Sequence, residues 1–373
     1  MIKIGFDAKR AFYNSRGLGN YSRDTIRILS HNEPDNKYFL FTPKTQQAIK
    51  FPISSNCQII QPESFFYKKA SSLWRTYQAC DEINSLHLDI FHGLSHELPV
   101  GIEKTSTRSV VTMHDVIFLK FPHLYTWIDR ELYKRKYLRS CRIADKIIAI
   151  SEQTKRDLID FAGIDEQKIT VVYQGCNPLF LKEISEDRLQ SIKKKYNLPS
   201  HFLLNVGAIE KRKNQELIIQ ALAHGHIDLP LVIIGKPTEY LKELKSLIEK
   251  FKIESKVIFL TNIPTEDLPA IYQLSSIFIY PSLFEGFGIP ILEALNSKVP
   301  VITSKGSCFE ETGGAGSYYI DHESVDDLIV AIENILDNTE MRQTMIDAGL
   351  KHAKLFSDKR ISENLMSVYQ SAL

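Results

Sequence analysis

The chain lacks the sequence signatures of several common protein classes. No apolar run approaches the roughly 20 residues of a membrane span. The start, MIKIGFDAKR, indicates a strand followed by charges rather than a signal peptide, so we expect a cytoplasmic protein that at most lies on the inner face of a membrane. The five cysteines form no Cys-x-x-Cys pair, which argues against a zinc knuckle and a disulfide framework.

A strong charge of one sign and low-complexity tracts are missing as well. The net charge of +1 over 373 residues argues against general binding to nucleic acid. Basic residues exceed acidic ones in residues 1–180 and the balance reverses after them, which suggests that the first part faces something anionic. With 43% hydrophobic and 24% charged residues, the composition is that of a soluble globular protein with room for two domains.

Strand-like and helix-like segments alternate along the whole chain. The strand candidates of the first part are IKIGF, YFLF, DIF, SVVT, KIIAI and ITVVY, and those of the second are FLLNVG, LVIIG, VIFL, IFIY, VPVIT and SYYI. Such alternation is typical of α/β layers around a mostly parallel sheet. It predicts two doubly wound, Rossmann-like domains at 1–180 and 181–356, followed by a helix at 357–373 that could dock on either domain.

Residues with unusual chemistry cluster directly after the predicted strands. RGLGN follows the first strand, His92 follows DIF, His114 and Asp115 follow SVVT, EKRKN follows FLLNVG, and FEGFGIP follows IFIY. Open α/β sheets bind ligands at the carboxyl ends of their strands. We therefore expect two domains that face each other across a ligand-binding cleft.

The stretch PSLFEGFGIPILEAL predicts a junction of strand, turn and helix that carries two carboxylates. Pro290 suits the first turn of a helix, so Glu285 is expected in the turn and Glu293 on the helix. Gly286 and Gly288 let the backbone approach a ligand, and free amides at a helix start attract phosphate. Glu293 could then accept hydrogen bonds from a sugar diol. The alternative is that both carboxylates are solvated.

Two cations, Arg212 and Lys213, follow the strand that ends at Gly207 in NVGAIEKRKN. Cations at the start of a helix oppose its dipole, so stability alone does not explain them. An anionic ligand does explain them, because Arg forks onto phosphate oxygens and Lys supplies a point charge. A solvated basic turn is the alternative.

The histidines admit both binding and structural interpretations. Neighbours in an extended segment point in opposite directions, so His114 could contact substrate while Asp115 is structural, or His114 could be a satisfied buried residue. His92 and His96 have the i, i+4 spacing of some metal pairs. Gly93 and the lack of an evident third ligand favour a loop without metal.

Two further segments are predicted to be helical. The segment 127–142, WIDRELYKRKYLRSCR, interleaves basic and aromatic residues, so it could rest on anionic lipid or a lipid-linked acceptor, or be a solvated helix face. Ser151, which opens SEQTKRDLIDFA, is expected to cap a helix N-terminus.

Six segments, taken in order over nearly the whole chain, resemble the motifs of the retaining glycosyltransferases of family 4. They are RGLGN, HDV, ISE, VGAIEKRKN, FEGFGIPILEAL and SCFEETGGAG. The resemblance implies the GT-B architecture of two facing Rossmann-like domains, with a final helix that crosses back to the first. It also implies transfer of a hexose from a nucleotide-diphosphate sugar to a growing glycan or lipid-linked acceptor.

The resemblance gives individual residues their roles. It implies that Glu285 contacts hydroxyls of the transferred sugar, that Glu293 holds the ribose, that Arg212 and Lys213 bind the diphosphate, and that His114 lines the sugar site. The catalytic candidates are thus His114, Arg212, Lys213 and Glu285. The other donor-binding candidates are Gly17, Gly207, Gly286, Phe287, Gly288 and Glu310, and the acceptor-binding candidates are Gly19, Asn20 and His92.

One departure from the family pattern is Ala208, where many relatives carry an arginine that also contacts the diphosphate. Mannosyltransferase-like members with a small residue there look closest, which favours GDP-mannose as donor.

No Asp-x-Asp is present, so we expect neither a metal nor another cofactor. The alternatives are a sugar-nucleotide epimerase of the same architecture and a nucleotide-sugar-binding protein without turnover. A dinucleotide oxidoreductase is disfavoured because RGLGN lacks the third glycine of that motif.

Overall fold

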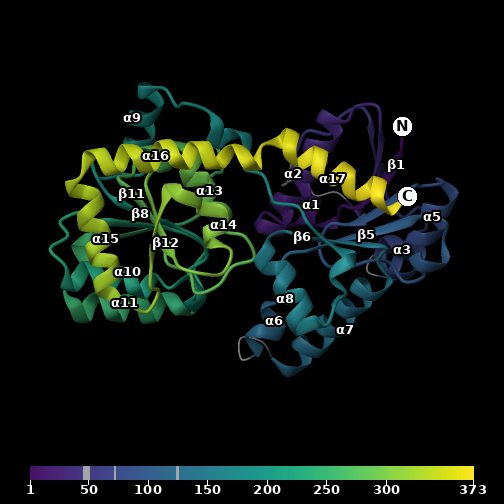
Figure 1. The fold of residues 1–373 in the computed structure, drawn as a ribbon, viewed down its shortest axis with the longest axis horizontal. Helices are drawn as coiled ribbons and strands as arrows, with labels where there is room; N and C mark the ends of the chain where they lie inside the picture. Colours follow the sequence, from purple (N-terminus) through teal and green to yellow (C-terminus); the bar gives the residue numbers. More distant parts are fainter. Residues whose placement is uncertain (45–50, 71–72, 123–125) are drawn as a thin grey trace. The chain divides into compact units, whose positions relative to one another are not determined.

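The chain forms two compact units, each built around its own parallel sheet (Figure 1). The computed structural model describes residues 1–44, 51–70, 73–122 and 126–373. The first unit comprises Met1–Gly175 and Phe356–Leu373, and the second comprises Cys176–Leu355. Residue 180, where the sequence predicts the boundary, falls in η5 (Pro178–Leu181) of the second unit.

Among the described residues of the first unit, the sheet has seven strands in the order β3-β2-β1-β4-β5-β6-β7, and all neighbours run parallel. The strands are β1 (Lys3–Asp7), β2 (Lys37–Phe41), β3 (Cys57–Ile60), β4 (Ile90–Gly93), β5 (Arg108–Met113), β6 (Lys146–Ala149) and β7 (Ile169–Val171). Apart from β3 at the edge, their mostly apolar runs reflect burial on both faces, as is typical of parallel sheets.

The sheet of the second unit has six parallel strands in the order β10-β9-β8-β11-β12-β13. The strands are β8 (Leu203–Val206), β9 (Leu231–Ile234), β10 (Val257–Leu260), β11 (Ile277–Tyr280), β12 (Val301–Ser304) and β13 (Ser317–Ile320). Leu203 pairs with Ile277 on one side and Leu231 on the other, and all three are fully buried. Each such side chain stabilises the fold by about 1.5–3 kcal/mol.

All twelve predicted strands are present, and β3 is the one further strand in the described part of the chain, which the sequence did not predict. Its four residues, CQII, are half-buried or exposed at the edge of the first sheet. A short edge strand with so little burial lacks the apolar run from which the other strands could be read.

Helices and short helical turns connect the strands. In the first unit they are α1 (Lys9–Tyr13), α2 (Gly17–Asn32), α3 (Phe65–Lys69), η1 (Trp74–Gln78), α5 (Ala79–Ser85), η2 (Ile102–Lys104), α6 (Ile117–Lys120), α7 (Trp127–Ile143), α8 (Glu152–Ala162), η4 (Glu166–Lys168) and α17 (Asp358–Ala372). In the second unit they are η5, α9 (Glu186–Lys195), η6 (Lys211–Lys213), α10 (Gln215–His224), α11 (Tyr240–Phe251), η7 (Glu254–Lys256), α12 (Leu268–Leu274), α13 (Ile289–Asn296), α14 (Phe309–Gly313), η8 (Gly314–Gly316), α15 (Val325–Asp337) and α16 (Thr339–Ala353), with η9 (Lys354–Phe356) leading into α17.

The capping residue predicted from the sequence is present. The Ser151 hydroxyl accepts a hydrogen bond from the Thr154 amide at 3.0 Å, which satisfies a free amide of α8. The predicted helix at 127–142 is α7, where Thr126 accepts from the Asp129 amide at 3.2 Å. None of the helices within the described ranges is long and apolar enough to cross a membrane.

The last helix, α17, belongs to the first unit, where it packs on α2 and β5 (Figure 1). Arg27 of α2 donates to Asp358 at the start of α17 with an N–O distance of 2.5 Å. Near the end of the helix, the Tyr369 hydroxyl lies 2.8 Å from Nδ1 of His92 in β4. These two contacts hold α17 against α2 and the first sheet.

The segment RGLGN forms the start of α2. Gly17 is the first residue of α2, and the amides of Gly19 and Asn20 both donate to the Arg16 carbonyl. A Cβ at Gly19 would lie 1.7 Å from the Asn14 carbonyl oxygen, so only glycine fits there. Close packing of the helix start on the preceding turn accounts for this glycine.

Candidate active site

The strand order of the second sheet places two loops side by side. The sequence runs outward from β8 to β10 and then returns to β11 on the other side of β8. At such a switch point the loops that follow the two central strands diverge and leave a crevice for a ligand. Here those loops carry Arg212 and Lys213 after β8 and Glu285 after β11.

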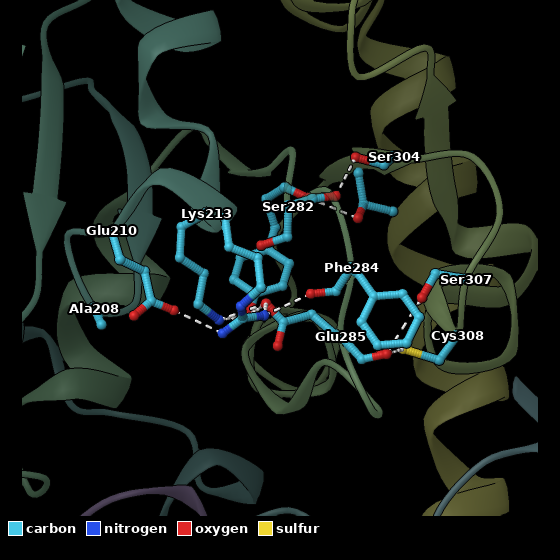
Figure 2. A network of polar contacts seen from close by, with 12 residues as sticks. Ala208, Glu210, Lys213, Ser282, Phe284, Glu285, Ser304, Ser307 and Cys308 are labelled. Carbon is cyan, nitrogen blue, oxygen red and sulfur yellow. Dashed lines mark hydrogen bonds and ion pairs between the residues drawn. The ribbon is translucent and has the colours of Figure 1, made fainter. Parts of the chain in front are cut away.

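Glu285 is the centre of a polar network that joins these two loops (Figure 2). Its Oε1 accepts from Nζ of Lys213 at 2.5 Å and from the Tyr280 hydroxyl at 3.1 Å. Nη1 of Arg212 lies 2.7 Å from the same oxygen. The three contacts converge on Oε1, so within the described part of the chain Oε2 has no protein partner.

Backbone bonds hold the two loops at this spacing. The Leu283 amide donates to the Arg212 carbonyl at 2.9 Å, and the Arg212 guanidinium donates to the Phe284 carbonyl at 2.5 Å. The Glu285 carbonyl accepts from the Ser307 hydroxyl and from Sγ of Cys308, each at 3.3 Å (Figure 2). The segment that carries Glu285 is thus fixed from both sides.

The charges of the site are buried and mutually compensated. The side chains of Lys213 and Glu285 are only 11% and 12% exposed. Burial raises the pKa of Glu285, but the charges of Lys213 and Arg212 outweigh it and lower this pKa to about 2. Burial lowers the pKa of Lys213 from its usual value despite the neighbouring carboxylate. Both cations are therefore held by one carboxylate oxygen when no anion is bound.

The sequence did not predict two members of the network. Glu210 accepts from Nη2 of Arg212 at 2.7 Å, and the Tyr280 hydroxyl accepts from Lys213 at 2.6 Å. Lys213 also lies 4.9 Å from the centre of the Tyr280 ring. In the sequence, Tyr280 has the pattern of an ordinary core residue at the end of β11. Only its position opposite the loop after β8 reveals its role.

The glycine-rich turn after Glu285 leads directly into α13. Gly288 has φ +97°, a left-handed conformation that a larger residue would adopt only with strain. Pro290 lies in the first turn of α13, as predicted. The intervening Phe287 is buried, and its carbonyl accepts from Thr312 at 2.5 Å. Gly207 follows β8, and the aliphatic part of Lys213 packs over it.

The other two predicted glutamates lie outside the network around Glu285. Glu293 is half-buried on α13, where Oε2 accepts from the Tyr272 hydroxyl at 2.9 Å. Glu310 is exposed in the first turn of α14 and accepts from the Gly306 amide at 3.2 Å. Ala208, at the position of the missing arginine, contributes only its carbonyl, which accepts from Gln215.

His114 lies in the first unit, directly after β5. It is 5% exposed, and its Nε2 lies 2.9 Å from the Leu94 carbonyl oxygen. A carbonyl can only accept, so Nε2 carries the proton and Nδ1 bears the lone pair. Burial and the neighbouring His96 lower the pKa of His114 to about 3, which keeps the ring neutral. His96 accepts from the His114 amide at 3.0 Å.

His92 occupies a different environment from the one expected. It is a residue of β4 rather than of the following loop, and it is fully buried. Nδ1 is bonded to Tyr369 and Nε2 to Thr112, at 2.8 and 2.7 Å. Both ring nitrogens are therefore engaged inside the fold, and we leave His92 out of the acceptor site proposed below.

The remaining acceptor candidates lie at the start of α2. Gly17 has open space where a side chain would lie, and Asn20 is exposed with its Oδ1 accepting from Arg23. Gly19 is buried against Asn14. Across the part of the chain that the structure describes, no group of three or more His, Cys, Asp or Glu side chains could hold a metal ion.

The geometry of the second unit suits one kind of chemistry. Two fixed cations at a sheet switch point can neutralise an anion that departs from a substrate, and such preorganised charge lowers a barrier without reorganisation. Glu285 is held beside them with Oε2 available to a hydroxyl. The arrangement can therefore stabilise negative charge and accept a hydrogen bond from a hydroxyl.

Comparison with known proteins agrees with this fold. Residues 17–178 match the sequence model of "Glycosyltransferase Family 4", and residues 187–352 match that of "Glycosyl transferases group 1". The structure of Anabaena HepE in complex with UDP and glucose superposes with a TM-score of 0.76 at 18% identity, over 100% of both chains.

Two curated proteins of Escherichia coli are also similar. O-antigen chain mannosyltransferase B is 28% identical over 388 residues, which cover 99% of this chain and 100% of that protein. Serotype-specific mannosyltransferase WbdA is 29% identical over 275 residues, 71% of this chain but 34% of that protein.

Two Rossmann-like units with these sheet orders and this site define the chain as a glycosyltransferase of GT-B architecture. More particularly, the chain belongs to glycosyltransferase family 4, with a family 4 domain in its first part and a group 1 domain in its second.

Proposed function

We propose that the protein transfers a hexose, with mannose favoured, from a nucleotide-diphosphate sugar to a growing glycan or lipid-linked acceptor, with retention of anomeric configuration. The observation that carries the proposal is the contact of Arg212 and Lys213 with a single oxygen of Glu285. The name of the E. coli relative that spans the whole chain, an O-antigen chain mannosyltransferase, supports the choice of mannose and of a glycan acceptor. GDP-mannose is the donor that we favour.

In the proposed complex the diphosphate replaces Glu285 as the partner of the two cations. Arg212 offers a planar fork and Lys213 a compact charge, and both are already fixed by their neighbours. Glu285 then accepts hydrogen bonds from hydroxyls of the sugar. We assign Glu293 to the ribose, because it is a half-buried carboxylate on α13, positioned by the Tyr272 hydroxyl, and carboxylates accept hydrogen bonds from diols.

The reaction breaks the bond between the anomeric carbon and the diphosphate oxygen and forms a bond from that carbon to the acceptor oxygen. Positive charge grows at the sugar while negative charge grows on the leaving diphosphate. Arg212 and Lys213 stabilise the second charge, and the leaving phosphate oxygen takes the acceptor's proton. We assign no protein nucleophile, and we propose His114 as a neutral residue that lines the sugar site, with Nδ1 as the acceptor. No divalent ion is required in this scheme.

A panel of donors tests the proposal. GDP-mannose, UDP-glucose and ADP-glucose are compared by thermal shift, and a donor at a hundred times its dissociation constant stabilises the protein by about 2.7 kcal/mol. The stabilising donor is then incubated with mannose-terminated oligosaccharides. We expect an extended product whose new linkage keeps the donor's α configuration by NMR. Lys213→Met is the matched variant that should lose the thermal shift.

The alternatives give different outcomes of the same experiment. A sugar-nucleotide epimerase of this architecture would change or release the sugar without any acceptor. A binding protein would show the thermal shift without a product. An inverted product linkage would overturn the retaining mechanism.

We further propose that α7 brings the enzyme to an anionic membrane surface. Near its N-terminus Trp127, Ile128 and Leu132 are 69%, 65% and 54% exposed, which is unusual for large apolar side chains. Basic residues follow on the same helix, including Lys134 and Arg135. Exposed apolar residues beside Lys and Arg are typical of helices that lie in the interface of an anionic bilayer.

A further inference from the structure

A second cavity lies wholly within the first unit, between η1 and α7. Its volume is about 240 Å³. Trp74, Phe91 and Leu98 form part of its apolar lining, and Arg135, Lys136 and Arg139 of α7 line another part. Asp7 and Phe41, the last residues of β1 and β2, also line it. The cavity therefore opens at the carboxyl ends of strands next to the switch between β1 and β4, where open sheets bind ligands.

One arginine forms ion pairs with two acidic residues that line this cavity. Arg75 lies 2.8 Å from Asp7 and 2.7 Å from Glu97. Burial lowers the pKa of Arg75, but these two carboxylates outweigh it and raise the pKa above its usual value. Lys136 approaches Glu97 only to 3.9 Å. Asp7, Arg75 and Glu97 together carry one net negative charge, which the three cations of α7 exceed.

The cations of α7 differ in how they are held. Arg139 donates to the carbonyls of Leu98 and Pro99 and lies 3.5 Å from Glu103, so it is fixed at the rim. Arg135 is exposed and has no ion-pair or hydrogen-bond partner among residues 1–44, 51–70, 73–122 and 126–373. A positioned arginine beside a free one suits an anion with several oxygens, such as a diphosphate.

The same face of α7 continues as an apolar track away from the cavity. Ile128, Leu132, Arg135 and Arg139 are spaced i, i+4, i+7 and i+11, so they lie on one side of the helix. Ile128 and Leu132 are 65% and 54% exposed, and Ile128 lies about 10 Å along the helix axis from Arg135. An anion-binding rim next to an exposed apolar stripe matches a molecule with a charged group joined to a hydrocarbon chain.

We propose that this cavity and the adjoining face of α7 bind a lipid-linked acceptor through its diphosphate. The diphosphate lies against Arg135, Lys136 and Arg139, the first part of the lipid follows Leu132 and Ile128, and the sugar end enters the cavity beside Tyr77. This inference rests on the proposed function and names the acceptor class for it.

Direct binding tests the inference without any turnover. Farnesyl diphosphate, inorganic diphosphate and farnesol are titrated by calorimetry into Lys213→Met protein, which disables the diphosphate site of the second unit. We expect farnesyl diphosphate to bind at least about tenfold more tightly than either fragment, because charge-assisted hydrogen bonds and apolar burial act together. Equal binding of inorganic diphosphate overturns the lipid-linked acceptor, and absence of farnesyl diphosphate binding overturns the site.

Paired variants locate the binding. In the same background, Arg135→Gln with Lys136→Gln should weaken farnesyl diphosphate binding by at least about tenfold. Lys134→Gln with Arg142→Gln removes the same charge from the same helix outside the cavity and should change affinity less than twofold. Equal losses in the two pairs overturn the assignment. Donor binding by the enzyme with Lys213 intact is measured separately, so failure of the proposed transferase function is distinguishable from failure of this inference.

Discussion

Arg212 and Glu285 are joined by both side chain and backbone. Nη1 of Arg212 lies 2.7 Å from Oε1 of Glu285 and 2.5 Å from the carbonyl oxygen of Phe284, the residue before it. The Arg212 carbonyl in turn accepts from the Leu283 amide. The backbone bonds therefore hold the two loops at a fixed spacing, even where a ligand takes the place of Glu285 as the partner of Arg212. Such a preformed site loses little free energy to ordering when the donor binds.

Glu293→Ala should weaken binding of the nucleotide diphosphate, the donor and the transition state alike. The proposed contact is to the ribose, which all of them share, so KM should rise with a smaller change in kcat. Calorimetry with the nucleotide diphosphate and initial rates measure the two effects. Tyr272→Phe, which removes the hydroxyl 2.9 Å from Glu293 but keeps the carboxylate, should have a smaller effect. Unchanged nucleotide affinity in Glu293→Ala would place the ribose elsewhere.

Turnover should survive EDTA. Arg212 and Lys213 supply the positive charge that a divalent ion would otherwise bring to the leaving diphosphate. Initial rates are compared before and after chelation, with Mg²⁺ and Mn²⁺ added back. Loss of activity that either ion restores would show that the cations of the protein are insufficient.

Trp127→Ser with Ile128→Ser should weaken binding to vesicles that contain anionic lipid. The two side chains are 69% and 65% exposed and would otherwise bury apolar surface in the bilayer interface. Co-sedimentation at low and high salt measures binding, and higher salt should weaken the wild type. The control is Val330→Ser, an exposed apolar position on α15. If the wild type ignores anionic vesicles at low salt, α7 is only a solvated helix.

The buried histidines should make the fold sensitive to mild acid. Burial lowers the pKa of His92 and of His114 to about 3, below the usual value of about 6.5 for histidine. Because the unfolded state binds these protons first, their stabilising effect is complete above pH 6.5 and is lost as the pH falls toward 3. Each histidine contributes a slope of about 1.36 kcal/mol per pH unit.

Buried acidic groups act in the opposite direction, among them Asp24 and Asp157, because burial raises their pKa values. Burial raises the pKa of Asp24 to about 6, so its ionisation disfavours the fold above that pH and the penalty disappears on acidification toward 3.8. Three histidines, which include His96 with a pKa lowered by burial to about 4, outweigh these aspartates, and we expect the melting temperature to fall from pH 7 to pH 5. His92→Gln should reduce this slope, whatever its effect on stability at pH 7. Identical slopes in the two proteins would contradict the assignment.

The sequence was most informative where burial imposes a pattern. The twelve strands with apolar runs were predicted because parallel strands are buried on both faces, and β3 was missed because its edge position leaves Gln58 exposed. The placement of Glu285 in a turn and Glu293 on a helix also followed from local signals, namely the glycines and Pro290.

Contacts between distant segments could not be predicted in the same way. That Tyr280 and Glu210 join the network depends on the packing of two loops that are far apart in sequence. His92 was expected in a loop because it follows an apolar triplet, whereas β4 extends through Gly93 and turns the ring into the core. Gly19 suggested approach to a ligand, and the structure shows approach to the backbone of Asn14.

The most direct test of the account compares Glu285→Ala with Glu210→Ala, since both carboxylates contact Arg212. Calorimetry measures the affinity for the nucleotide diphosphate, and initial rates measure sugar transfer. Glu285→Ala should keep the nucleotide affinity, because it frees both cations for the diphosphate. Its turnover should fall by roughly 10²-fold, which corresponds to about 2.7 kcal/mol of lost transition-state stabilisation. Glu210→Ala should keep most of its turnover. Full activity in Glu285→Ala, or a large loss of its nucleotide affinity, would contradict the central claim that this carboxylate recognises the sugar beside a diphosphate held by Arg212 and Lys213.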